Sequence, residues 1–174
     1  MSQIIRTEHR LRNAAQRILS KLALKATAIS FAAIAFCSAA APSADAQLFD
    51  LSAYKGQVVY LDFWASWCGP CKQSFPWLNE LAARYGASGL AVVAVNVDHD
   101  RYLADTFLHE HRPHFSVVFD PGGAVASQYA VKAMPTSMII GRDGQVRTAH
   151  SGFFENQETQ YLADVRAALD EKAP

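Results

Sequence analysis

The sequence lacks a net charge, and it has no cluster of basic residues outside its first part. Its 174 residues include 16 basic and 16 acidic side chains, which gives a formal net charge of +0. The basic excess lies within residues 1–46, so residues 47–174 carry ten basic against fourteen acidic side chains. A mildly acidic body of this kind argues against nucleic acid as the main partner.

The sequence also lacks internal repeats, and its longest apolar run near the N-terminus is too short for a comfortable membrane span. That run, residues 26–36, follows a basic stretch and precedes small residues that end with ADA at 44–46. These are the parts of a secretory signal peptide. We therefore expect residues 1–46 to be a cleaved signal peptide, with an uncleaved membrane anchor as the alternative. Residues 47–174 then form one globular domain.

Cysteine is scarce, and the lack of further ligands limits what the three cysteines can do. Cys37 lies within the expected signal peptide, so a disulfide inside the remaining domain must join Cys68 and Cys71. Zinc sites of this type need two more thiolate or imidazole ligands, and no second Cys-x-x-Cys exists. Haem attachment requires a histidine where Lys72 stands. A structural disulfide closing so small a loop contributes little, which leaves redox exchange as the favoured interpretation.

Apolar, β-branched runs alternate with helical patterns along the expected domain. The near-continuous apolar runs at 57–63 and 90–97 are typical of strands covered on both faces. Further strands are expected at 115–119, 136–140 and 145–150, and helices from 71 to 86, at 101–111, at 124–129 and at 158–169. The order βαβαβαββα predicts an α/β fold with helices on both faces of a mixed central sheet.

The cysteine pair lies where the first strand ends and the first helix begins. Cys68 should therefore lie at the helix N-terminus, where backbone N–H groups and the helix dipole favour a thiolate. Since the thiolate is the attacking species, Cys68 is the expected nucleophile and the more enclosed Cys71 the resolving thiol. Gly69 allows close approach by a protein substrate, and Pro70 suits the first turn of a helix. The adjacent Trp67 is expected to form the surface on which a partner docks.

Two segments of the sequence resemble a known family. The segment VYLDFWASWCGPCKQSFP, residues 59–76, resembles the active-site segment of thioredoxin, and AVKAMPTSMII, residues 130–140, resembles the thioredoxin segment that carries its cis-proline. Together they are similar to the extracytoplasmic TlpA- or ResA-like thiol–disulfide oxidoreductases, which have an extra helix and strand within the thioredoxin fold. The stretch between Val97 and Ala124 matches that extra unit. The resemblance covers residues 47–174 and implies a thioredoxin fold with no cofactor.

Further residues take expected roles from this resemblance. Pro135 matches the cis-proline of the family, which would place the backbone of Met134 beside Cys68 as an edge for a substrate strand. The alternative is an ordinary trans proline in a loop. Asp62 matches the buried acid of thioredoxin, where burial raises the pKa of the carboxyl and lets it exchange a proton with Cys71. The alternative is a solvated aspartate at a strand end.

The sequence departs from the family pattern at two positions. Ala94 stands where thioredoxin has a lysine near its buried acid, and Ser74 stands where many TlpA-like proteins have a glutamate. These departures weaken an assignment to apocytochrome c but leave the thiol chemistry unaffected.

Three histidines in six residues, His109, His111 and His114, suggest a metal site. No fourth ligand can be named for it, so we interpret the cluster as a solvated helix end and expect no metal.

The resemblance and the signal peptide together predict a function. We expect a periplasmic or otherwise extracytoplasmic enzyme that reduces disulfides of exported proteins, with apocytochrome c, in cytochrome c biogenesis, as one candidate substrate. Its electrons would come from a membrane thiol donor of the DsbD or CcdA type, because the periplasm is kept oxidising. The protein is expected to be a monomer that binds no nucleic acid. The alternatives are an oxidase or isomerase of the same fold and, from another class, a metal-binding module.

Overall fold

The computed structural model describes residues 49–172. Within this range a short 3-10 helix, η1 (Leu51–Tyr54), precedes five strands and four α-helices. In chain order these are β1 (Val58–Trp64), α2 (Gly69–Tyr85), β2 (Leu90–Asn96), α3 (Arg101–His111), β3 (Ser116–Phe119), α4 (Ala124–Gln128), β4 (Thr136–Ile140), β5 (Val146–Ser151) and α5 (Glu158–Asp170). Two further 3-10 turns, η2 (Gly86–Ser88) and η3 (Glu155–Gln157), follow α2 and precede α5.

The described strands form one five-stranded sheet with the order β3-β2-β1-β4-β5. β1, β2 and β3 are parallel, whereas β4 runs antiparallel to β1 and β5 antiparallel to β4. All seven residues of the central strand β1 are buried, which explains its nearly continuous apolar sequence. α3 and β3 form the predicted extra unit, and β3 extends the sheet beside β2.

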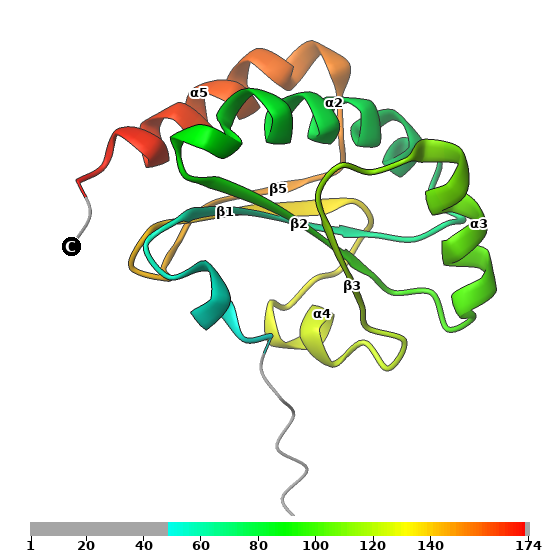
Figure 1. The fold of residues 1–174 in the computed structure, drawn as a ribbon. Helices are drawn as coiled ribbons and strands as arrows, with labels where there is room; N and C mark the ends of the chain where they lie inside the picture. The colour runs from blue at the N-terminus through cyan, green and yellow to red at the C-terminus, as the bar shows by residue number, and fades with distance from the viewer. Residues whose placement is uncertain (1–48, 173–174) are drawn as a thin grey trace, which may run out of the picture. The chain divides into compact units, whose positions relative to one another are not determined.

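Helices cover both faces of the sheet (Figure 1). α2 and α5 lie side by side over one face, where they pack with Tyr60 and Trp64 of β1. α4 and η1 lie on the other face, over the alternating β1 residues Val59, Leu61 and Phe63. We refer to these as the α2 face and the α4 face. α3 adds its own apolar side chains to the α2 face.

The predicted fold is confirmed, and several elements have the predicted bounds, as Arg101–His111 and Thr136–Ile140 illustrate. The segment before β1, for which the sequence analysis predicts no element, contains η1. There the Asp50 carboxylate accepts a hydrogen bond from the N–H of Ser52 over 2.8 Å and caps η1, whose single turn is too short to show a helical period. The predicted signal peptide lies outside the described residues. Among residues 49–172, no helix has the length and apolar character needed to cross a membrane.

Candidate active site

Cys68 and Cys71 form a disulfide at the start of α2. Cys68 is the N-cap residue, with φ −83° and ψ 109°, and the N–H of Cys71 donates a hydrogen bond to its Sγ over 3.2 Å. Both residues are buried, Cys71 completely and Cys68 with 4% of its surface exposed. The helix therefore directs an N–H group and the positive end of its dipole at the sulfur of Cys68, an arrangement that favours a thiolate there.

The residues around the disulfide differ strongly in exposure. Trp67 is 70% exposed, and Gly69 and Pro70 are exposed as well. A Cβ added to Gly69 would meet no atom within 4 Å, so packing within the described chain does not require a glycine there. Trp64, in contrast, is fully buried against Phe75 with ring centroids 4.9 Å apart. The surface beside Cys68 is thus open to a partner, while the first tryptophan of the motif belongs to the core.

The loop that leads from β1 to Cys68 is held by a carboxylate that sequence analysis missed. Asp98 accepts hydrogen bonds from the backbone N–H of Ser66 over 2.9 Å, from its hydroxyl over 3.0 Å and from the Asn96 amide over 2.8 Å. Asp98 is 5% exposed, and three donors satisfy its charge. The sequence did contain a signal: Asn96 is the last residue of a buried parallel strand and Asp98 follows it, and polar side chains at the carboxyl ends of such strands meet at one edge of the sheet.

A cis peptide bond joins Met134 to Pro135. β4 pairs with β1 so that its first residue lies opposite Phe63, which places this bond at the sheet edge where the loop to Cys68 begins. Pro135 is buried, and its carbonyl accepts a hydrogen bond from the N–H of Gly152 over 2.8 Å. Met134 is half-buried and packs against the hydrophobic clusters of both faces.

Asp62 is buried within β1. It is 2% exposed, and its Oδ2 has no hydrogen-bond partner among residues 49–172. Strand alternation places it on the α2 face, between Tyr60 and Trp64, in the layer that also contains Cys71. Burial raises the pKa of this carboxyl well above its ordinary value. A neutral carboxylic acid at this position can donate a proton within the buried layer.

The two departures from the family pattern both lie on the α2 face. Ala94 of β2 is the register partner of Asp62, so this position supplies no cation to the carboxyl, and burial is the cause of its raised pKa. Ser74 is buried, and its hydroxyl donates a hydrogen bond to the carbonyl of Cys71 over 3.1 Å. Neither position brings a charge to the site.

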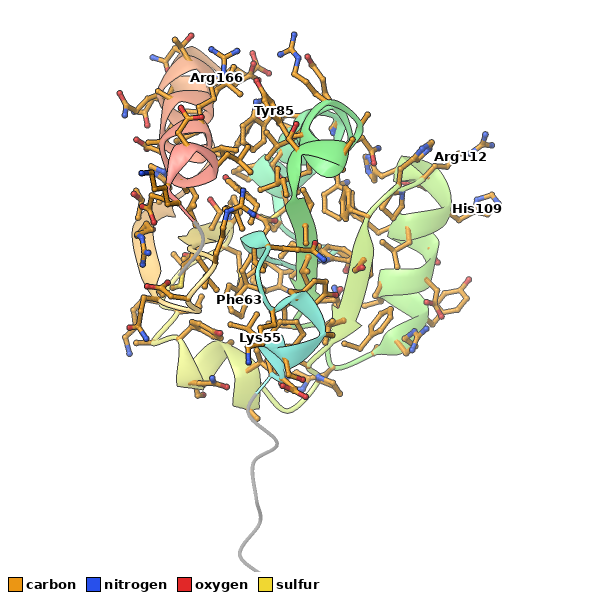
Figure 2. The ribbon with its side chains drawn as sticks, turned by 60° about the vertical axis from the view of Figure 1, so that its left-hand side comes forward. Lys55, Phe63, Tyr85, His109, Arg112 and Arg166 are labelled. Atoms are coloured by element: carbon orange, nitrogen blue, oxygen red, sulfur yellow. A yellow bond between two sulfur atoms is a disulfide. The ribbon has the colours of Figure 1, made fainter. Side chains whose placement is uncertain are left out.

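The three histidines near the end of α3 do not converge. Figure 2 shows His109 pointing away from the body of the domain. His111 instead packs its ring against Phe107 and Phe75, with centroids 4.1 Å and 5.9 Å away. Within the part of the chain that the structure describes, no three His, Cys, Asp or Glu side chains are placed to hold a metal ion. The pattern of histidines, including His114, therefore reflects an aromatic contact and solvated positions.

A family model described as Redoxin matches residues 21–169. Among curated proteins, the chain is similar to thiol-disulfide oxidoreductase ResA of Bacillus thuringiensis subsp. konkukian, with 35% identity over 97 residues that cover 56% of each protein. It is also similar to ResA of Oceanobacillus iheyensis, with 34% identity over 122 residues, or 70% of this chain and 64% of that protein. The chain thus matches little more than half the length of the first of these relatives.

Among solved structures, the chain resembles a crystal structure from Chlorobium tepidum that is provisionally described as thiol:disulfide interchange protein DsbE. The TM-score is 0.67 and the identity 50%, and the match covers 68% of this chain and 84% of that one. The sheet order and flanking helices described above are those of a thioredoxin-like fold, and the Redoxin match extends over most of the sequence. The chain therefore belongs to the Redoxin family and has a thioredoxin-like fold.

Proposed function

We propose that this protein is a thiol–disulfide oxidoreductase that reduces disulfides of exported proteins through Cys68 and Cys71. The observation that carries the proposal is the disulfide at the N-terminus of α2, where an N–H group and the helix dipole address the sulfur of Cys68. The names of the ResA and DsbE relatives support the same chemistry. A buried acid, Asp62, on the same face of the sheet adds a proton donor and acceptor.

In the proposed reaction the reduced enzyme gives two electrons to its substrate. The Cys68 thiolate attacks one sulfur of a substrate disulfide, that S–S bond breaks, and the other substrate sulfur leaves as a thiolate that takes a proton from solvent. The neutral Asp62 first releases its proton, and Cys71 then loses its proton to the resulting carboxylate. The Cys71 thiolate attacks the sulfur of Cys68, which forms the enzyme disulfide and breaks the bond to the substrate. The second substrate sulfur leaves as a thiolate that takes a proton from solvent.

The surface around Cys68 fits a protein substrate. Trp67, Gly69 and Pro70 are exposed beside the sulfur, and the sheet edge that carries Met134 and the cis-proline Pro135 lies at the same end of β1. In the proposed complex, Trp67 packs on the substrate and the backbone of Met134 pairs with an extended substrate segment.

The proposed location is extracytoplasmic. Residues 1–46 act as a signal peptide or an anchor, and residues 47–174 work as a monomeric domain in the periplasm or an equivalent compartment. A membrane thiol donor of the DsbD or CcdA type then returns the disulfide to the dithiol form, since that compartment is kept oxidising. Apocytochrome c, and with it a role in cytochrome c biogenesis, is one candidate for the substrate.

The test is a Cys71→Ser variant, which keeps the nucleophile and removes the resolving thiol. It should accumulate mixed disulfides between Cys68 and its substrates, visible on non-reducing gels and identifiable by mass spectrometry. The matched control, Cys68→Ser with Cys71→Ser, should trap nothing. A Cys71→Ser protein that forms no mixed disulfide would contradict the proposal. A reduction potential well above the glutathione range of about −220 to −260 mV would favour the oxidase or isomerase alternative.

A further inference from the structure

Polar side chains cross the α2 face of the sheet in a row. Asp62 of β1 is the register partner of Ser137 in β4, and Ser137 is the register partner of His150 in β5. Directly opposed residues of antiparallel strands have their side chains on the same face, with Cβ atoms about 4.5–5.5 Å apart. The three side chains therefore form one line on a face that is otherwise largely apolar, and this line starts at the buried Oδ2 of Asp62 that has no hydrogen-bond partner in the described chain.

Tyr60 connects to the middle of this row. Its hydroxyl donates a hydrogen bond to Oγ of Ser137 over 2.8 Å, and both side chains are buried. Burial, and next the negative charge of Asp62, raise the pKa of Tyr60, with smaller contributions from Tyr161 and Asp164. The phenol thus stays protonated, and it lies near carboxyl groups at both ends of the row.

His150 and Asp164 form the outer end of the row. Nε2 of His150 lies 3.1 Å from Oδ2 of Asp164 on α5, although the approach is not aligned for a hydrogen bond. Their side chains are 17% and 21% exposed, whereas Asp62 is 2% exposed. The His150 ring also packs against Tyr161, with centroids 4.8 Å apart. The row therefore leads from a sealed carboxyl to two partly exposed side chains, although Nε2 of His150 itself is buried.

We propose that Ser137 and His150 conduct protons between Asp62 and solvent, with the Ser137 hydroxyl held by Tyr60 and the exit at the His150–Asp164 pair. This inference rests on the proposed function, because it concerns the protons that Asp62 exchanges with Cys71. The register row, the hydroxyl–hydroxyl hydrogen bond and the contact at the exit carry it.

The thiol chemistry needs such a route in both directions. When a donor thiolate attacks the sulfur of Cys68, the S–S bond breaks and Cys71 leaves as a buried thiolate that takes the proton of Asp62. The carboxylate left behind has Ala94 as its β2 register partner, which offers no cation, so it must regain a proton. Ser137 gives its proton to Asp62, takes one from His150, and His150 is reprotonated from solvent beside Asp164. In the substrate-reducing direction the same transfers run in reverse, because a neutral Asp62 must first release its proton to accept that of Cys71.

The test measures how fast dithiothreitol reduces the oxidised protein, by acid quenching and alkylation of the released thiols across pH 5–9. His150→Gln and Ser137→Ala should each slow reduction about tenfold, a part of the effect typical of general acid–base groups. Asp62→Asn should slow it at least as much, and adding His150→Gln to Asp62→Asn should slow it no further. His109→Gln, on the exposed side of α3, is the matched control and should leave the rate unchanged.

The response of the reduction rate to buffer and to imidazole separates proton conduction from structural support. Besides Asp62 and His150, the titratable groups that face the row are Tyr60 on β1 and Tyr161 and Asp164 on α5, and all of them remain in His150→Gln. If His150 conducts protons, the reduction rate of a variant without it should rise with buffer concentration, because buffer molecules then supply the proton. Added imidazole should likewise restore the reduction rate of a His150→Ala protein. A structural role predicts slowing that is independent of buffer and not restored by imidazole.

Two outcomes would overturn the route while leaving the proposed function intact. One is that Asp62→Asn slows reduction by dithiothreitol while His150→Gln and Ser137→Ala leave its rate at the wild-type value. The other is a His150→Gln effect that is equally large when Asp62 is already replaced. In contrast, a Cys68→Ser protein that still reduces substrate disulfides would refute the proposed function itself.

Discussion

The two faces of the sheet are built from the same strands but from different kinds of residue. On the α4 face, β1 and β2 present only apolar side chains, among them Val59, Leu61 and Phe63. On the α2 face, the same strand β1 presents Tyr60 and Asp62, and the disulfide lies in the layer above them. Because side chains alternate along a strand, one strand of seven residues supplies both layers.

Because of this difference, neighbouring residues of β1 serve different purposes: one contributes to stability and the next to the proposed chemistry. The α4 face packs the sheet against α4 and η1 and has no role in the proposed reaction. The α2 face contains buried polar groups that an apolar core would not need, and these groups lower stability unless they are hydrogen-bonded or neutral. Substitutions on neighbouring residues of β1 should therefore have different kinds of effect.

The largest effect on stability is expected on the α4 face. Phe63→Ala should lower the free energy of unfolding by about 3–5 kcal/mol, because it removes a fully buried ring that packs against Tyr129. Urea unfolding of the oxidised protein measures the loss. Per folded molecule, reduction by dithiothreitol should keep the wild-type rate. Phe63→Leu, as the milder control, should lose less, and a changed reduction rate in either variant would show that the faces are coupled.

A smaller effect, dependent on pH, is expected from Asp62 on the α2 face. Its pKa is raised in the folded protein, so the folded state binds more protons than the unfolded state. Its contribution to stability is present below the unfolded pKa and is lost as pH rises toward and through the folded pKa, by up to about 1.4 kcal/mol per pH unit. Asp62→Asn should remove this loss.

Urea unfolding at pH 5, 6, 7 and 8 measures the difference between wild type and Asp62→Asn. The free energy of unfolding of the wild type should fall relative to that of the variant as pH rises. Phe63→Leu, which keeps the carboxyl, should retain the wild-type dependence. A constant difference between wild type and Asp62→Asn across this range would mean that the carboxyl is not held neutral.

The smallest effect on stability is expected where two polar side chains of the α2 face form a hydrogen bond with each other. Tyr60→Phe should lower the free energy of unfolding by about 1 kcal/mol, since it removes one buried hydrogen bond to Ser137. Combining it with Ser137→Ala in a double-mutant cycle should give a positive coupling energy, because the second change removes a group that has already lost its partner. Strictly additive losses would show that the hydroxyls do not interact in solution.

The sequence predicted the layers of the molecule better than its polar details. Apolar strands and helical periods indicated the mixed sheet with helices on both of its faces. The motif around Cys68 and the motif around Pro135 indicated which edge of the sheet holds the disulfide. Both kinds of signal are local, and each lies within one short segment of the sequence.

The details that were missed depend on register between distant segments. Asp98 lies 32 positions from Ser66, and Ser137 lies 77 positions from Tyr60. His150 shows no distinctive local pattern, and only the pairing of β4 with β5 places it in the row. The histidine-rich stretch on α3, which does have a local pattern, proved to include a ring packed on Phe107.

The start of the described chain has a consequence for handling the protein on a surface. The N–H of Phe49 donates a hydrogen bond to the side chain of Gln128 at the end of α4, over 3.2 Å, and its ring packs on the α4 face. The disulfide lies with the α2 layer instead, next to the exposed amine of Lys72. A biosensor chip or an electrode coupled through a tag fused ahead of Phe49 should hold the disulfide toward solution, whereas amine coupling at Lys72 should cover it.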